Sequence, residues 1–187
     1  MLRLVNIRML SLGVAFVGVV TTLTTGVTCN RARSEVVAAA PQSSAELMGA
    51  WRLVRTPNPR GGPDAVSIMH TADTSRSDLN LAGLMIRCSR EGSELAIVLL
   101  NAFPLRARPH VTFGKPGRER QFEATIGAPG TAVVLPGEPK TVLGEAWSAE
   151  GDVFIRLTEG SNTISGVVPL GGIKSAFPLL KANCPAP

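Results

Sequence analysis

The sequence has no tyrosine and few other aromatic residues, which together make up only 4% of its 187 positions. Charged residues are also sparse, at 18%, against 44% hydrophobic residues. This balance excludes an intrinsically disordered chain, because disorder requires low hydrophobicity and high net charge. We therefore expect a globular core that is filled mainly by Val, Ile, Leu and Ala.

Histidine and cysteine are scarce as well, with two and three copies. A structural metal site needs three or four clustered ligands. His70 and His110 lie forty residues apart, and two of the cysteines are better used in a disulfide. We predict neither a metal ion nor another cofactor.

The net charge of +5 comes largely from the N-terminus. Four arginines and one acid lie before Pro41, and without them 15 basic and 13 acidic residues remain, a net charge of +2. A domain with so small an excess has no large field to attract a polyanion. This distribution argues against nucleic acid as a partner.

Residues 1–40 are typical of an export segment. Two arginines precede a nearly unbroken apolar run over 9–20, and a charged start followed by about 7–15 apolar residues is the form of a signal peptide. We predict a signal peptide or an N-terminal membrane anchor followed by a linker, with Cys29 as a candidate lipidation site. The expected location is the periplasm or the exterior, with an inner-membrane anchor as the alternative.

Cys88 and Cys184 are predicted to form a disulfide. Cys88 shares one face of a predicted strand with Ile86, and Cys184 continues the apolar stripe of a short helix through Leu180. Both sulfurs therefore point toward the core in a chain expected to reach an oxidising compartment. The bridge would pin the helix onto a sheet.

Residues 41–187 are predicted to form one all-β domain, a sandwich or a barrel-like fold with a short C-terminal helix. A polar linker covers 41–44, and short apolar runs then recur between Gly/Pro turns, as in sandwiches and barrels. The predicted strands are 51–55, 65–71, 81–88, 94–101, 109–113, 121–126, 131–135, 141–147, 153–158 and 164–168. The helix is predicted to begin at Ser175, which places Pro178 in its first turn, and to end at Asn183.

An ordered set of short motifs accompanies these strands: an early Trp, a Ser-containing strand, an apolar strand that ends in Arg-Cys, and a late helix that ends in Cys. The residues that carry it are Trp51, 66–68, 84–88, 94–95, 164–166, 172–173, Ala176, Leu180 and Cys184. Over 51–184 the chain resembles the exported small proteins associated with type VI secretion (the TagO/VasI group) and, more loosely, the invasion-associated locus B group. The resemblance implies a periplasmic accessory or interaction protein of β-sandwich type with one disulfide, and not an enzyme.

His70, Asp73 and Ser75 have the composition of a catalytic triad. Three members within six residues rarely reach one another correctly, and the sequence contains no nucleophile elbow. A polar turn in which Asp73 and Ser75 or Ser77 cap backbone donors is the simpler interpretation. A small hydrolase that uses His70 and Asp73 is kept as an alternative.

One segment is rich in basic residues: Arg106, Arg108, His110, Lys115, Arg118 and Arg120. It is either a binding patch for an acidic envelope protein, an anionic lipid or a lipopolysaccharide phosphate, or a solvated hairpin edge whose charges prevent aggregation. The leading hypothesis is a non-catalytic accessory protein of the cell envelope that binds through this patch. The remaining alternative is a carrier with an apolar cavity for a lipid or small ligand.

Overall fold

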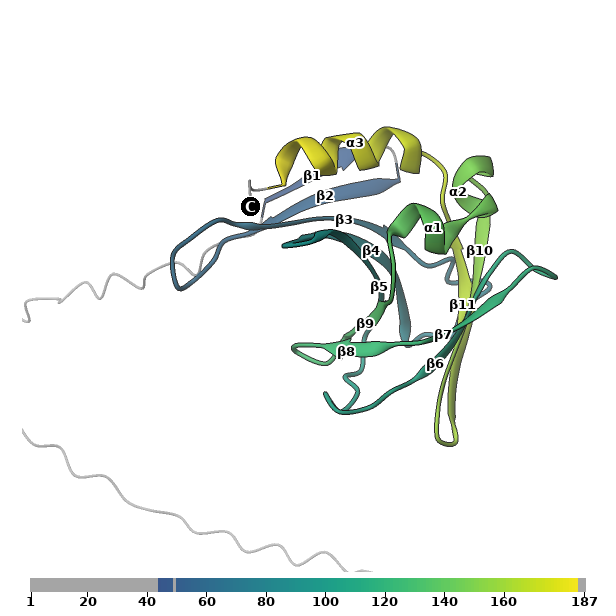
Figure 1. Cartoon of the computed structure of the whole chain (residues 1–187). Helices are drawn as coiled ribbons and strands as arrows, with labels where there is room; N and C mark the ends of the chain where they lie inside the picture. Colours follow the sequence, from purple (N-terminus) through teal and green to yellow (C-terminus); the bar gives the residue numbers. More distant parts are fainter. Residues whose placement is uncertain (1–43, 49, 185–187) are drawn as a thin grey trace, which may run out of the picture. The chain divides into compact units, whose positions relative to one another are not determined.

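A computed structural model describes residues 44–48 and 50–184, which build two antiparallel sheets (Figure 1). The seven-stranded sheet has the order β1-β2-β3-β4-β5-β9-β8, and the four-stranded sheet has the order β11-β10-β6-β7. The strands of the larger sheet are β1 (Ser44–Met48), β2 (Trp51–Thr56), β3 (Ala65–Thr71), β4 (Leu81–Ser89), β5 (Gly92–Leu99), β8 (Thr125–Gly127) and β9 (Ala132–Leu135). Those of the smaller sheet are β6 (His110–Gly114), β7 (Arg120–Glu123), β10 (Asp152–Glu159) and β11 (Asn162–Pro169). The predicted all-β class is confirmed.

Alternation of apolar and polar residues sets which side of each strand is buried. In β10, Val153, Ile155 and Leu157 are fully buried, and Ile155 lies opposite Phe113 of β6 and Gly166 of β11. The larger sheet follows the same rule with aliphatic side chains. The result is one core in which Trp51 and Phe113 are the largest fully buried side chains.

The C-terminal helix α3 (Ile173–Asn183) packs on β2, β3 and β4 (Figure 1). Its buried stripe is Ile173, Ala176, Phe177 and Leu180. The indole of Trp51 donates a hydrogen bond to the carbonyl of Gly171 at 3.1 Å, which fixes the chain just before the helix. The predicted helix and its apolar stripe are confirmed.

The two sheets are joined along two seams. At the first, β7 runs into β8 through the single buried residue Ala124, so one stretch of chain pairs with β6 and then with β9. At the second, the loop after β3 covers the outer edge of β11: the N–H groups of Asp73 and Asp78 donate to the carbonyls of Val167 and Ser165 at 2.9 and 2.8 Å. These seams make the sandwich barrel-like.

Several predicted elements and boundaries were wrong. The stretch 141–147 is not a strand but belongs to α1 (Pro139–Leu143) and α2 (Glu145–Ala149), separated by Gly144. The stretch 121–126 is split between the sheets at Ala124, and 44–48, expected to begin in a linker, forms β1. Helix α3 begins at Ile173 with Gly172 as its N-cap, so Pro178 lies inside the helix and not in its first turn.

The predictions for residues 1–40, including Cys29, lie outside the described residues. Within the described part of the chain, no helix is long and apolar enough to cross a bilayer.

Candidate functional site

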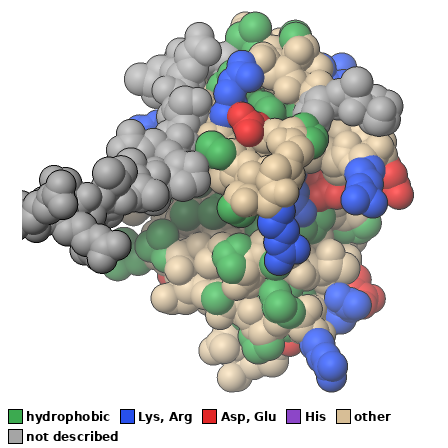
Figure 2. All heavy atoms as spheres, turned by 90° about the vertical axis from the view of Figure 1, so that its left-hand side faces the viewer, with side chains coloured by type: hydrophobic (Ala, Val, Ile, Leu, Met, Phe, Trp, Pro, Cys, Tyr) green, Lys and Arg blue, Asp and Glu red, His purple; other side chains and the backbone are tan. Residues whose placement is uncertain are grey.

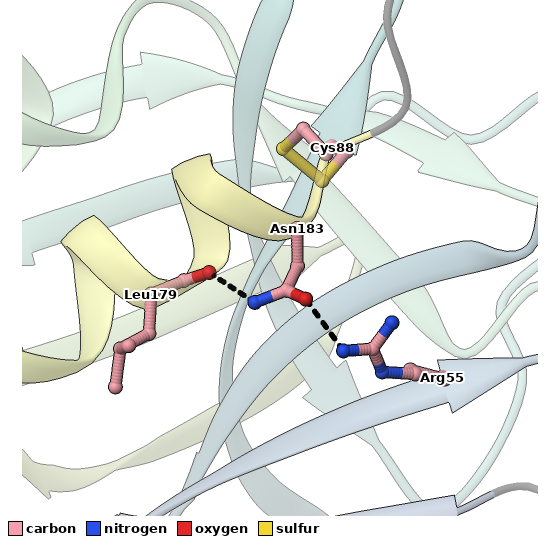
Figure 3. Close-up of a disulfide and its surroundings, with 5 residues drawn as sticks. Arg55, Cys88, Leu179 and Asn183 are labelled. Carbon is pink, nitrogen blue, oxygen red and sulfur yellow. Dashed lines mark hydrogen bonds between the residues drawn. A yellow bond between two sulfur atoms is a disulfide. The ribbon is translucent and has the colours of Figure 1, made fainter.

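The predicted disulfide is present. Cys88 near the end of β4 is bonded to Cys184, the C-cap of α3, with an S–S distance of 2.11 Å, a Cα–Cα distance of 5.6 Å and a sequence separation of 96. Beside it, a guanidinium N–H of Arg55 donates to the side-chain oxygen of Asn183 at 2.5 Å, and the Asn183 amide donates to the carbonyl of Leu179 at 2.7 Å (Figure 3). The end of α3 is thus tied covalently to β4 and by hydrogen bonding to β2.

A pocket of about 940 Å³ opens beside this bridge. Three segments distant in sequence line it: the loop between β2 and β3, the turn between β4 and β5, and the end of α3. Its lining residues are Thr56, Pro57, Asn58, Pro59, Pro63, Asp64, Ala65, Cys88, Ser89, Arg90, Gly92, Lys181 and Cys184. This site is not visible in the sequence, because its three segments meet only once α3 has packed on the larger sheet.

The pocket combines apolar walls with a few charges. Three prolines and the disulfide supply rigid apolar surface, while Arg90, Lys181 and Asp64 supply the ionisable groups. In the described residues neither Arg90 nor Lys181 has an ion-pair partner, and both are exposed. An apolar cavity of roughly 300–1,000 Å³ with a few polar groups is the usual form of a small-molecule site.

The basic segment is distributed along the β6–β7 hairpin. Arg106 and Arg108 precede β6, whereas Lys115, Arg118 and Arg120 follow it, so the five-residue strand separates them. On β6 itself the exposed His110 lies opposite the acidic Glu123 of β7. Figure 2 shows a different side of the domain, the one with the β2–β3 loop, where hydrophobic side chains gather in a hollow.

Two arginines of the basic segment are used within the fold. Arg118 forms an ion pair with Glu145, and Arg120 donates hydrogen bonds to the carbonyls of Thr141 and Val142 near the end of α1. Cations favour the C-terminal ends of helices, where carbonyls lack partners. With Lys115, these arginines line a smaller pocket of about 260 Å³. The bonds that Arg118 and Arg120 make within the fold favour a structural role for these two arginines.

The structure separates His70 from Asp73. The buried ring of His70 packs edge-on against Trp51, with ring centroids 5.2 Å apart, and its Nδ1 lies 2.8 Å from the carbonyl oxygen of Thr71. Asp73 instead accepts hydrogen bonds from the N–H and hydroxyl of Ser75, at 2.9 and 2.6 Å. No hydrogen bond joins His70 to Asp73 in the part of the chain that is described.

Asp73 caps a turn, as the simpler interpretation predicts. The hydroxyl of Ser75 and then the guanidinium of Arg76 hold the pKa of Asp73 below its ordinary value of 3.8, at about 2. Arg76 also bonds Asp152 at 2.6 Å, so the turn is fastened to β10. Ser77 is a second cap, since its hydroxyl oxygen accepts from the N–H of Val167 at 2.9 Å.

No group of three or more His, Cys, Asp or Glu side chains among the described residues is placed to hold a metal ion. No protein-family model, curated protein or solved structure matches this chain. The pocket beside the disulfide is therefore the candidate site that the geometry itself defines.

Proposed function

We propose that the protein is a non-catalytic accessory protein of the cell envelope, and that it binds an amphipathic anion in the pocket beside the Cys88–Cys184 bridge. The observation that carries the proposal is this pocket, which has apolar walls, two exposed cations, Arg90 and Lys181, and one acid, Asp64. An acyl-type body would cover the prolines and the disulfide. A carboxylate or phosphate head would lie against the cations.

Two features support an envelope location. The first forty residues have the form of an export segment, and the disulfide belongs to an oxidising compartment. The resemblance over 51–184 to exported accessory proteins agrees with both. The location is tested by fractionating cells and mapping labelled thiols by mass spectrometry. We expect Cys88 and Cys184 to be oxidised in the periplasmic or membrane fraction, and reduced thiols in a cytoplasmic fraction would contradict the proposal.

Ligand binding is tested by titrating the protein with dansyl-undecanoic acid and with the methyl ester of the same probe. We expect saturable binding of the acid, and weaker binding of the ester because it has no charge for the cations to pair with. Arg90→Gln should weaken binding of the acid roughly two- to fivefold, since an exposed ion pair contributes about 0.5–1 kcal/mol. Arg60→Gln is the matched control, because Arg60 is exposed in the same β2–β3 loop but does not line the pocket.

A second variant tests whether the probe occupies the pocket at all. Ala65→Trp places a large side chain at an exposed position that lines it. Binding should be lost while the circular dichroism spectrum stays unchanged. Equal affinity for acid and ester, or unchanged binding in the Ala65→Trp variant, would refute the assignment.

A further inference from the structure

Three leucines are exposed at the end of the domain where β4 begins and β5 ends. Leu79, Leu100 and Leu105 are 82%, 67% and 56% exposed. Leu79 and Leu100 are held beside the same residue, because the N–H of Leu100 donates to the carbonyl of Asn80 at 3.0 Å. Leu105 follows on the connection from β5 to β6, which is fixed where Phe103 donates to the carbonyl of Gly130 at 2.9 Å.

Two of these leucines occupy the tips of tight turns. The turn around Leu79 is closed by the N–H of Leu81, which donates to the carbonyl of Asp78 at 3.0 Å. The turn around Leu105 is closed in the same way from Ala107 to Pro104, at 2.9 Å. Turn tips favour Gly, Pro, Asn, Asp and Ser, so a leucine at a tip does not stabilise the turn itself. Single exposed leucines are ordinary, but three at one end of a small domain indicate a binding surface.

The connection from β5 to β6, which carries Leu100 and Leu105, is positively charged. Residues 99–109 contain Arg106 and Arg108 and no acid, and both arginines are exposed without an ion-pair partner in the described residues. Asp78, beside Leu79, is an exposed acid whose carboxylate accepts from the N–H of Asn80 at 2.9 Å. Glu123, opposite His110 on β7, is the acid across from the start of β6.

We propose that this leucine end, formed by Leu79, Leu100, Leu105, Arg106 and Arg108, docks on the surface of an anionic phospholipid bilayer. Leucine side chains enter the boundary between head groups and acyl chains, and arginines pair with lipid phosphates. A protein partner is less well matched, because protein interfaces are centred on aromatic anchors and leucine is under-represented among their hot spots. The proposal does not depend on the pocket ligand, since the pocket lies at the opposite end of β4 and β5.

The test places an indole at the proposed contact. The full chain with Leu100→Trp is mixed with phosphatidylglycerol vesicles whose acyl chains carry bromine, which quenches indole fluorescence at short range. The Leu179→Trp chain is the matched control, because Leu179 is 45% exposed on α3, away from the leucine end. Both variants contain the same residues 1–43, so insertion of that segment affects them alike, and the wild-type chain gives the background from its two tryptophans. We expect strong quenching in the Leu100→Trp variant and background quenching in the control.

The arginines are tested in the same assay. Arg106→Ser with Arg108→Ser should lower the ratio of docked to undocked protein about 30-fold, because each basic side chain near an anionic surface contributes about a fivefold factor. Arg52→Ser with Arg60→Ser removes the same charge elsewhere and should leave quenching unchanged. Equal quenching at positions 100 and 179, or docking that persists on neutral phosphatidylcholine or without the two arginines, would overturn the proposal. An unquenched indole at position 100 that crosslinks to an envelope protein would also overturn it.

Discussion

Replacing Cys88 and Cys184 by alanine opens a loop that spans 96 residues of sequence. In the chain-entropy model, a bridge across about 100 residues stabilises the folded state by roughly 4–5 kcal/mol, because it restricts the unfolded chain. Helix α3 keeps its buried contacts through Ile173 and Leu180, so it should remain docked in the variant. A domain of this size loses about 3–4 °C in Tm for each kcal/mol, so we expect Tm to fall by roughly 12–20 °C.

The assay is thermal unfolding followed by circular dichroism, with Cys29→Ser in every protein so that no third thiol can mispair. A reducing agent should lower the Tm of the bridged protein toward that of the double variant. The same agent should leave the double variant unchanged, which controls for effects unrelated to the disulfide. A difference in Tm below about 3 °C would refute the reasoning, because the covalent link would then restrict the unfolded chain far less than its length requires.

Three further changes test the fold. Ser77→Ala removes the acceptor for the N–H of Val167 and should cost about 1 kcal/mol in denaturant unfolding; no change would mean that this bond does not hold the seam. Gly83→Ala should cost about 1–3 kcal/mol in the same measurement, because Gly83 has φ +154° and a Cβ would lie 2.0 Å from the carbonyl oxygen of His70. The Asp73 carboxylate, with its pKa lowered to about 2, stabilises the fold fully above about pH 4 and progressively less as the pH falls toward 2. Between pH 5 and pH 2 the Tm of the wild-type protein should therefore fall more than that of Asp73→Asn, and parallel curves would contradict this.

Alternation along the chain was enough to predict most strands. Residues 65–71 match β3 at both ends, and 153–158 lie within β10, where apolar side chains alternate with polar ones. The disulfide was predictable because each cysteine extended an apolar stripe. These features are local, so they are visible in a sequence without knowledge of the fold.

The error at 141–147 has a local cause. Thr141 and Val142 favour strands, but Pro139 stands at the start of α1. Val142 of α1 and Ala146 of α2 are buried on two separate short helices. Burial against the rest of the core decided between a strand and a helix for this stretch. That contact is set by the fold, and the propensity of a few residues cannot predict it.

Both candidate surfaces escaped prediction for a different reason. The pocket is assembled from three loops that meet only in the folded state, and the leucine end combines two turns that are separated in sequence. The basic segment, in contrast, is continuous in sequence and lies on both sides of β6. A run of charges is visible in a sequence, whereas a surface built from separate turns is not.

β7 and β8 are one uninterrupted stretch of chain, and each pairs with a strand of a different sheet. Because of this link, separating the strands of one sheet also displaces a strand of the other. Heat or denaturant should then melt both layers in one cooperative step, with no state in which half of the sandwich survives. Amide protons of β4 in the larger layer and of β10 in the smaller layer should exchange through the same global opening and report the same free energy. The buried residue Ala124, which links β7 to β8, thus couples the two layers into one thermodynamic unit.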